Sequence, residues 1–155
     1  MSPDLLAELR QLRPFASLQD EAYVGVALTA AVLQDAFEQM LKPHGISAAQ
    51  YNVLRILRGA EPEGLCRFEV RDRMISRMPD VTRLLDRLEK SGLISRVRGT
   101  EDRRVVLTRL TDKGRELVDA LDAEVAAEHQ RCLGHMDEKE LRKLMQLLET
   151  ARSKG

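Results

Sequence analysis

The spacing of hydrophobic residues predicts a mainly helical chain interrupted by one pair of strands. Val81, Leu84, Leu85 and Leu88 stand at positions i, i+3, i+4 and i+7, so all four lie on one face of a helix. Beyond this helix the period changes from 3.6 to 2, in "ISRVRG" and "RRVVLTRLT", with the polar segment "GTEDR" between them. This alternation predicts a β-hairpin.

Capping signals divide the rest of the chain into further helices. Serine, threonine or aspartate stands at the start of most of them, because these side chains accept hydrogen bonds from the free amides of the first turn. The expected elements are a leading helix ended by Pro14, a long helix from Ser17 to Lys42, a helix from Ser47 to Gly59, a short helix around Arg67 to Met74, a long helix from Thr111 and a last helix from Asp137. Tyr51, Leu54 and either Ile56 or Leu57 are expected to be buried.

The stretch from Ser76 to Ile94 is expected to form one helix, with Pro79 in its first turn and Gly92 at its end. Arginine, proline and aspartate crowd the start of this helix. A helix that only packs on a core has no need of such charge there. A helix N-terminus exposes amides and a partial positive charge, so this end is suited to meeting phosphate.

The middle of the first long helix, "VGVALTAAVL", is apolar on nearly every side. A helix of this kind has to be covered all round. A chain of 155 residues has little material for that purpose. We therefore expect a second copy of the chain to supply the cover.

Composition excludes several classes of protein. Hydrophobic residues make up 43% of the chain and charged residues 32%, which is typical of a globular protein of one domain. The longest run of low charge, "AYVGVALTAAVLQ", is too short to span a bilayer, and the start lacks the pattern of a signal peptide. These features predict a cytoplasmic protein without a membrane partner. Two cysteines far apart in the sequence predict free thiols, which fits a reducing compartment.

A net charge of zero conceals a strong asymmetry along the chain. Residues 67–109 hold 12 basic and 7 acidic residues, whereas the segments on either side are net acidic. An electrostatic footprint belongs to one face rather than to the whole chain. The middle segment is therefore expected to face a polyanion.

Three helices followed by a charged hairpin is the order of a winged helix-turn-helix, here within a mainly α (α+β) fold. In that arrangement the last of the three helices enters the major groove of double-stranded DNA and the hairpin, the wing, reaches phosphates or the minor groove. The candidate groove-reading residues are Arg77, Met78, Asp80, Thr82, Arg83 and Arg87. The candidate wing residues are Arg96, Arg98, Asp102, Arg103 and Arg104.

These side chains have distinct expected roles. Arg77 and Arg83 can offer paired donors to guanine, and Thr82 can contact phosphate or base. Asp80 has two open interpretations: it accepts from a cytosine amine, or it orients Arg83 or Arg77. A solvated helix surface is the alternative for the whole face.

The segment "VTRLLDRLEKSGLISRVRGTEDRRVVLTRLTDKGREL" resembles the signature of the MarR family of bacterial transcriptional regulators, including "DRR" in the wing. The resemblance implies a homodimer, with residues 1–46 and 112–155 as the dimerisation region and 47–111 as the DNA-binding lobe. It also implies a pseudo-palindromic operator and release of DNA by a small ligand or by oxidation. The family's wing arginine falls on Arg104 and its partner on Asp102, whereas the family often has a small polar residue in place of Asp80. Residues 1–16 lie outside the match.

The resemblance further implies an effector pocket between the dimerisation helices and the winged lobe, suited to a small aromatic or phenolic compound. Its candidate lining residues are Phe37, Met40, His44, Tyr51 and Arg55. A simple role in the core is the alternative for most of these residues.

Other kinds of chemistry find less support. No grouping typical of an enzyme is present, and no cofactor is expected. His129, Cys132 and either His135 or Met136 share one helix face, but a packed surface is the favoured interpretation over a metal site. Cys66, beside Arg67, suggests a redox-responsive regulator as an alternative. Two further alternatives are a winged helix that binds protein and a nonspecific DNA-binding protein.

Overall fold

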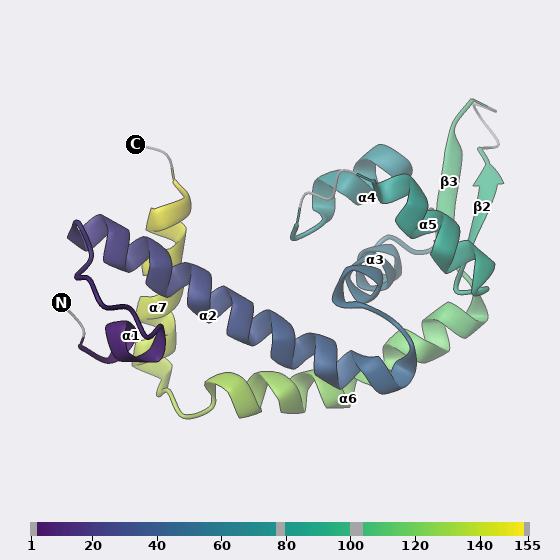
Figure 1. Ribbon diagram of the computed structural model, residues 1–155. Helices are drawn as coiled ribbons and strands as arrows, with labels where there is room; N and C mark the ends of the chain where they lie inside the picture. Colours follow the sequence, from purple (N-terminus) through teal and green to yellow (C-terminus); the bar gives the residue numbers. More distant parts are fainter. Residues whose placement is uncertain (1–2, 77–79, 100–103, 154–155) are drawn as a thin grey trace.

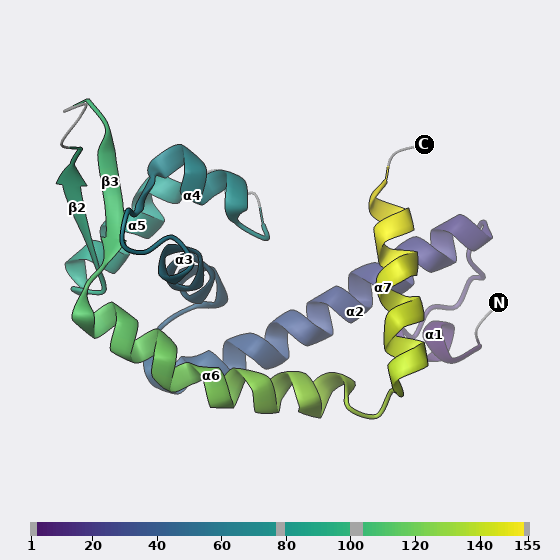
Figure 2. The same cartoon turned by 180° about the vertical axis from the view of Figure 1, so that it is seen from behind.

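Two long helices, α2 and α6, run through the molecule and connect its two ends (Figure 1). The computed structural model describes residues 3–76, 80–99 and 104–153. Its elements are α1 (Pro3–Glu8), α2 (Leu18–Leu41), the 3₁₀ turn η1 (Lys42–His44), α3 (Ala48–Arg58), β1 (Leu65–Cys66), α4 (Arg67–Arg73), α5 (Val81–Lys90), β2 (Ile94–Arg98), β3 (Val106–Leu110), α6 (Asp112–Leu133) and α7 (Glu138–Arg152). The helices α1 and α7 lie at one end with the start of α2, and α3, α4, α5 and the strands form a lobe at the other (Figures 1 and 2).

Side-chain caps start the helices where the sequence predicts them. Ser17 Oγ accepts from the amide of Asp20 at 3.1 Å at the start of α2. Ser47 and Gln50 form a reciprocal capping box on α3, and Asp137 and Glu140 form another on α7. These caps satisfy backbone donors that the helices leave unpaired. The predicted helix starts at these three places are confirmed.

The hairpin is confirmed and belongs to a larger sheet than predicted. The order is β1–β3–β2, antiparallel throughout, with Leu65 opposite Thr108 and Ile94 opposite Leu110. Strand β1 has two residues, too few to show an alternating pattern, so the sequence does not reveal it. The mainly helical winged helix-turn-helix fold predicted from the sequence is confirmed.

Two predicted helix boundaries are wrong. The helix α5 begins at Val81 rather than at Ser76, and Asp80 precedes it with non-helical angles, φ −129° and ψ 63°. Asp80 is therefore the N-cap, the position expected to precede the first helical residue. Pro79 lies outside the described residues. The leading helix ends at Glu8, well before Pro14.

The hydrophobic core lies in the winged lobe, where α3, α4, α5 and the sheet meet the ends of α2 and α6. The side chains that are less than 2% exposed include Leu41, Val53, Leu54, Leu57, Val70, Leu85, Leu88, Ile94, Val118 and Leu121. The long helix α2 buries only Leu41, and α7 buries no residue within the subunit. The winged lobe therefore has a hydrophobic core of its own. The described residues at the other end, where α1 and α7 lie with the start of α2, do not form such a core.

The segment "LTDKG" fixes the start of α6 against the end of α5, within the winged lobe. Thr111 caps α6 and donates its hydroxyl to the carbonyl of Gly92 at 2.6 Å. A Cβ on Gly114 would lie 2.0 Å from the carbonyl oxygen of Leu93, so only glycine fits this close approach. Gly92 itself has φ +73°, the left-handed conformation that ends a helix.

Candidate nucleic-acid interface

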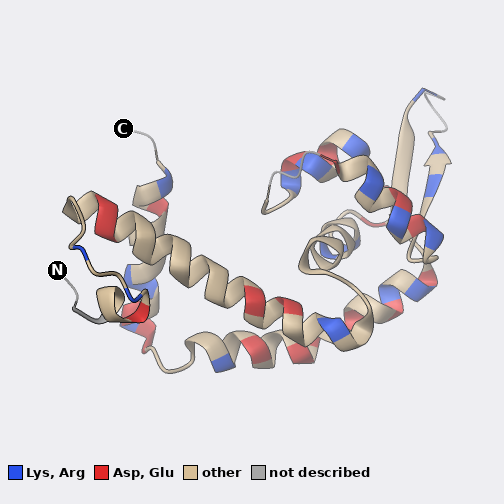
Figure 3. Cartoon of the chain, viewed as in Figure 1, with Lys and Arg blue, Asp and Glu red and all other residues tan. Residues whose placement is uncertain are grey.

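The helix α5 separates apolar and charged residues onto two faces. Val81, Leu84, Leu85 and Leu88 are buried against the lobe, as predicted. On the other side Arg83 and Arg87 are exposed and Thr82 is half-buried. Figure 3 shows basic residues along α4, α5 and β2, whereas acidic residues are common on α2 and α6. The charged face of α5 is therefore held outward by a fixed apolar face.

Asp80 and Arg83 form a unit at the start of α5. The Asp80 carboxylate accepts from the Arg83 amide at 3.1 Å, and its other oxygen lies 2.9 Å from Arg83 Nε. The carboxylate therefore caps the helix and holds the guanidinium at the same time. Of the two interpretations of Asp80, this geometry favours the orienting role, with Arg83 as its partner.

The sequence predicts that Arg96 in β2 contacts DNA. In the structure its partners are two carboxylates of α5. Its Nη2 lies 2.6 Å from Asp86 Oδ1 and 2.5 Å from Glu89 Oε2, both on α5. Hydrogen bonds from Arg96 hold the pKa of Glu89 below its ordinary value, and the same pair raises the pKa of Arg96. Arg96 thus joins the wing to α5 through ion pairs, so its charge is already neutralised within the subunit.

The remaining wing residues extend away from the core. Arg98 at the end of β2 and Arg104 before β3 are both exposed, and the amide of Gly99 donates to the carbonyl of Val105 at 2.8 Å. Four predicted contact residues, Arg77, Met78, Asp102 and Arg103, lie outside the described residues. Their roles stay predictions.

The structure adds two arginines of α4, Arg67 and Arg71, to the charged residues near α5. The sequence does not predict them as DNA contacts. The Arg67 guanidinium lies 4.7 Å from the centroid of the Phe68 ring and donates to Thr82 Oγ1 at 3.2 Å. The Arg71 guanidinium lies 5.3 Å from the same ring. The signal available in the sequence is "RFEVR", with two arginines four residues apart around an aromatic residue.

A cavity of about 240 Å³ lies between α2, α3, α6 and the segment before α5. Of the five predicted effector-pocket residues, it brings together Phe37, Tyr51 and Arg55. The other two lie elsewhere: Met40 lines a different hollow, and His44 Nε2 lies 2.9 Å from Glu124 Oε2.

Three ring-bearing side chains that line this cavity contact one another, with Phe37 in the middle. Phe37 meets Tyr51 edge-on with ring centroids 5.5 Å apart, and His129 stacks on Phe37 at 5.9 Å. Burial raises the pKa of Tyr51. The sequence suggests only a packed helix face or a metal ligand for His129, because nothing local shows that α6 brings it beside α2.

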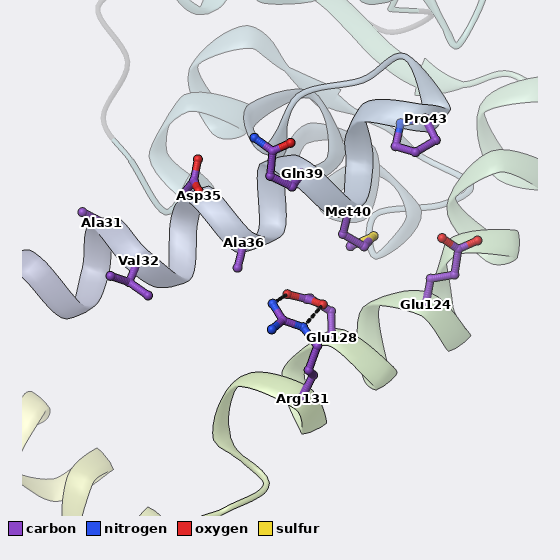
Figure 4. A pocket seen from close by; sticks show the side chains of 10 residues that line it. All are labelled: Ala31, Val32, Asp35, Ala36, Gln39, Met40, Pro43, Glu124, Glu128 and Arg131. Atoms are coloured by element: carbon purple, nitrogen blue, oxygen red, sulfur yellow. Dashed lines mark hydrogen bonds and ion pairs between the residues drawn. The ribbon is translucent and has the colours of Figure 1, made fainter.

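A second, open hollow of about 940 Å³ lies between α2 and α6 (Figure 4). Val32, Ala36 and Met40 line its α2 side. On its α6 side, the Arg131 guanidinium donates to both oxygens of Glu128, at 2.9 and 2.6 Å. Asp35 and Gln39 of α2 also line the hollow, so both helices contribute polar or charged side chains to it.

Both cysteines form hydrogen bonds with a glutamate close to them in the sequence. The Cys66 amide donates to Glu69 Oε2 at 2.8 Å, and this hydrogen bond and one from the Cys66 side chain lower the pKa of Glu69. Desolvation and Glu128 raise the pKa of the Cys132 thiol. Among the described residues, no three His, Cys, Asp or Glu side chains gather closely enough to hold a metal ion. In that same part of the chain, no helix is long and apolar enough to cross a bilayer.

The helix α5 has one buried face and a capped start that carries an arginine, and a basic antiparallel hairpin follows it. These features define the class of winged-helix DNA-binding proteins. Comparison with known proteins places the chain within that class. Residues 35–121 match the family of transcriptional regulators described as SarA/Rot. The HTH-type transcriptional regulator TtmR of Methylorubrum extorquens is 37% identical over 106 residues, which are 68% of this chain and 53% of that protein. The chain thus spans about half the length of this relative.

Solved structures of similar chains agree with this class. A MarR transcription factor from Planctomyces limnophilus is 41% identical, with a TM-score of 0.67 over 88% of this chain and 99% of that one. A mutant of MarR from Escherichia coli complexed with operator DNA is 25% identical, with a TM-score of 0.78 over 89% and 100%. CouR from Rhodococcus jostii, bound to p-coumaroyl-CoA, is 26% identical, with a TM-score of 0.73 over 88% and 94%.

The chain belongs to the MarR family of winged-helix transcriptional regulators, to which the sequence signature pointed.

Proposed function

We propose that this protein is a homodimeric, cytoplasmic repressor that binds a pseudo-palindromic DNA site and leaves it when a small aromatic or phenolic effector binds. In this proposal each α5 enters the major groove at one half-site and each wing lies against the adjacent minor groove. The observation that carries it is the start of α5, where Asp80 holds Arg83 outward on a helix whose other face is buried. The operator complex of the related MarR supports the same use of the fold.

Two arginine substitutions test the DNA-binding part. Arg83→Ala is expected to weaken binding by about 1–3 kcal/mol and to relax base preference, because a side chain in the major groove reads base edges. Arg104→Ala is expected to weaken binding to all duplexes alike, because a wing arginine contacts backbone or minor groove. Fluorescence anisotropy with an operator and with scrambled duplexes measures both effects. Equal losses that ignore sequence in both variants would contradict the groove assignment.

Exposed apolar residues support the dimer. Within one subunit, Tyr23 is 77% exposed, Val26 51% and Met145 60%. These residues lie on α2 and α7, at the end of the molecule that lacks a core of its own (Figure 1). Surfaces of this kind on a regulator are suited to a second copy of the chain. The hollow between α2 and α6 lies in the regions predicted for dimerisation, residues 1–46 and 112–155 (Figure 4).

The cavity of 240 Å³ supports control by an effector, because its wall includes the segment that precedes α5. Ile75 and Ser76 line it, a few residues before the cap of α5 at Asp80. The buried Asn52 on α3 accepts from the Ile75 amide at 3.0 Å. A ligand in the cavity therefore contacts the segment that sets the position of α5. Arg55 supplies a cation for an acidic group, and Phe37 and Tyr51 supply apolar ring contacts.

A binding experiment tests the effector site. A panel of aromatic carboxylic acids and phenols is titrated into the protein–operator complex, and the compound that releases DNA is then tested on Arg55→Ala. We expect release to need roughly tenfold or more of that compound in the variant, because a hydrogen-bonded ion pair with the acid is lost. An unchanged release curve would place the effector elsewhere, and the absence of any releasing compound would contradict effector control by this class.

A further inference from the structure

The hollow on the DNA-facing side of the lobe has the composition of an anion site. It has a volume of about 410 Å³ and lies between α4, α5 and β3. Arg67, Thr82 and Arg104 line it, together with the ring of Phe68. Arg96 also lines it but is paired with two carboxylates on α5. Whether the hollow can bind an anion therefore depends on the contacts of Arg67.

Arg67 is held in place by contacts that leave its charge unneutralised. Among the described residues, its partners are the Phe68 ring, at 4.7 Å, and the Thr82 hydroxyl, at 3.2 Å. Neither carries a negative charge, and within the described chain no carboxylate lies at ion-pair distance from this guanidinium. A guanidinium has five N–H donors, so most remain for a ligand.

Phe68 is a large hydrophobic residue that does not belong to the buried core cluster. Its side chain belongs to a residue that is 54% exposed, at the first turn of α4 beside the hollow. An exposed aromatic ring that supports a guanidinium restricts the rotamers of that guanidinium and so lowers the entropy lost when it binds an anion. The Phe68 ring thus acts as a support for Arg67.

The bond between Arg67 and Thr82 also fixes the polarity of the hydroxyl. Because Thr82 Oγ1 accepts from Arg67, its own proton is directed to another acceptor. A phosphate oxygen in the hollow would receive donors from both side chains. Thr82 lies in the first turn of α5, so this phosphate would adjoin the groove that α5 enters.

We propose that Arg67, supported by Phe68 and joined to Thr82, binds a backbone phosphate of duplex DNA in this hollow. The proposal rests on the proposed function, since it requires α5 to lie in the major groove. Arg67 contacts the phosphate directly, and Phe68 is a positioning residue.

Matched charge deletions on α4 test this assignment. Arg67→Ala is compared with Arg71→Ala, which removes the same charge from the same helix but belongs to a residue that pairs with Asp72 and does not line the hollow. Binding to an operator and to scrambled duplexes is measured by anisotropy over a range of salt concentrations. Arg67→Ala is expected to weaken binding roughly tenfold on every sequence and to reduce the slope of log K against log salt by about 0.9. Arg71→Ala is expected to keep the wild-type slope.

Further variants and readouts separate the possible failures. Phe68→Leu keeps an apolar side chain without a π face, and we expect it to weaken binding less than Arg67→Ala while keeping the slope. Equal slopes in Arg67→Ala and Arg71→Ala would overturn the proposal, whereas wild-type binding that ignores salt would overturn the proposed function itself. Thermal unfolding in phosphate and in chloride of equal ionic strength provides the last readout. Stabilisation by inorganic phosphate in the wild type alone, with unchanged DNA slopes, would assign the hollow to a free anion and overturn the proposal.

Discussion

At the scale of single residues, Asp80 has two tasks that a substitution can separate. Its carboxylate caps α5 through the Arg83 amide and holds the Arg83 guanidinium at 2.9 Å. Asparagine caps a helix about as well as aspartate but carries no charge. Asp80→Asn is therefore expected to keep the stability of the wild type and to lose base preference, because Arg83 is no longer oriented.

Asp80→Ala is the matched comparison for this prediction. Alanine removes the cap as well, so we expect a loss of about 1 kcal/mol in the free energy of unfolding in addition to the loss of base preference. Urea unfolding and sequence-resolved binding measure the two effects independently. Full base preference in Asp80→Asn would show that the carboxylate does not orient Arg83 on DNA.

At the scale of elements, Arg96 joins the wing to the recognition helix through Asp86 and Glu89. Because Arg96 lowers the pKa of Glu89 in the folded protein, the pair stabilises the fold above the ordinary pKa of 4.5, and the contribution is lost as pH falls through the lowered value. Arg96→Met lacks the pair. The stability difference between wild type and variant is therefore expected to be largest above about pH 5.

Urea unfolding between pH 3 and pH 7 measures this difference. Lys90→Met, which removes a charge from the exposed end of α5, is the control. A difference for Arg96→Met that stays constant down to pH 3 would mean that the ion pair does not join wing and helix in solution.

The elements that the sequence predicts well are those with local signals. The caps at Ser17, Ser47 and Asp137 depend on side chains three residues away, and the apolar stripe of α5 depends on its own periodicity. Features set by distant residues are not predictable in this way. The sequence gives no sign that β1 pairs with β3, or that His129 stacks on Phe37.

The candidate site divides along the same line. The exposed positions of Arg83, Arg87 and Arg98 follow from the helix and strand periods, so the sequence predicts them. The partners of Arg96 and Arg67 depend on how β2 and α4 pack against α5. The sequence shows that both residues are charged. It does not show that Asp86 and Glu89 neutralise Arg96, or that Phe68 and Thr82 hold Arg67.

At the scale of the whole molecule, one subunit buries a core only in its winged lobe. The helix α7 has an apolar stripe of Leu141, Leu144, Met145 and Leu148 at helical spacing and buries none of these residues. Leu144→Glu is expected to convert a dimer into a monomer, because it places a charge in the apolar interface. Lys143→Glu introduces the same side chain at an exposed position of α7 and should remain a dimer.

Sedimentation velocity at micromolar concentration distinguishes these species. A wild-type protein that sediments as a monomer would contradict the dimer. A Leu144→Glu variant that sediments like the wild type would move the interface away from α7.

In the proposed complex, two copies of α5 related by a twofold axis read duplex DNA about one helical turn apart. Selection of bound sequences from random duplex DNA is the decisive measurement for this arrangement. We expect enrichment of an inverted repeat whose half-site centres are separated by about 10 base pairs. Enrichment of a single asymmetric site, or no enrichment above the starting pool, would contradict it.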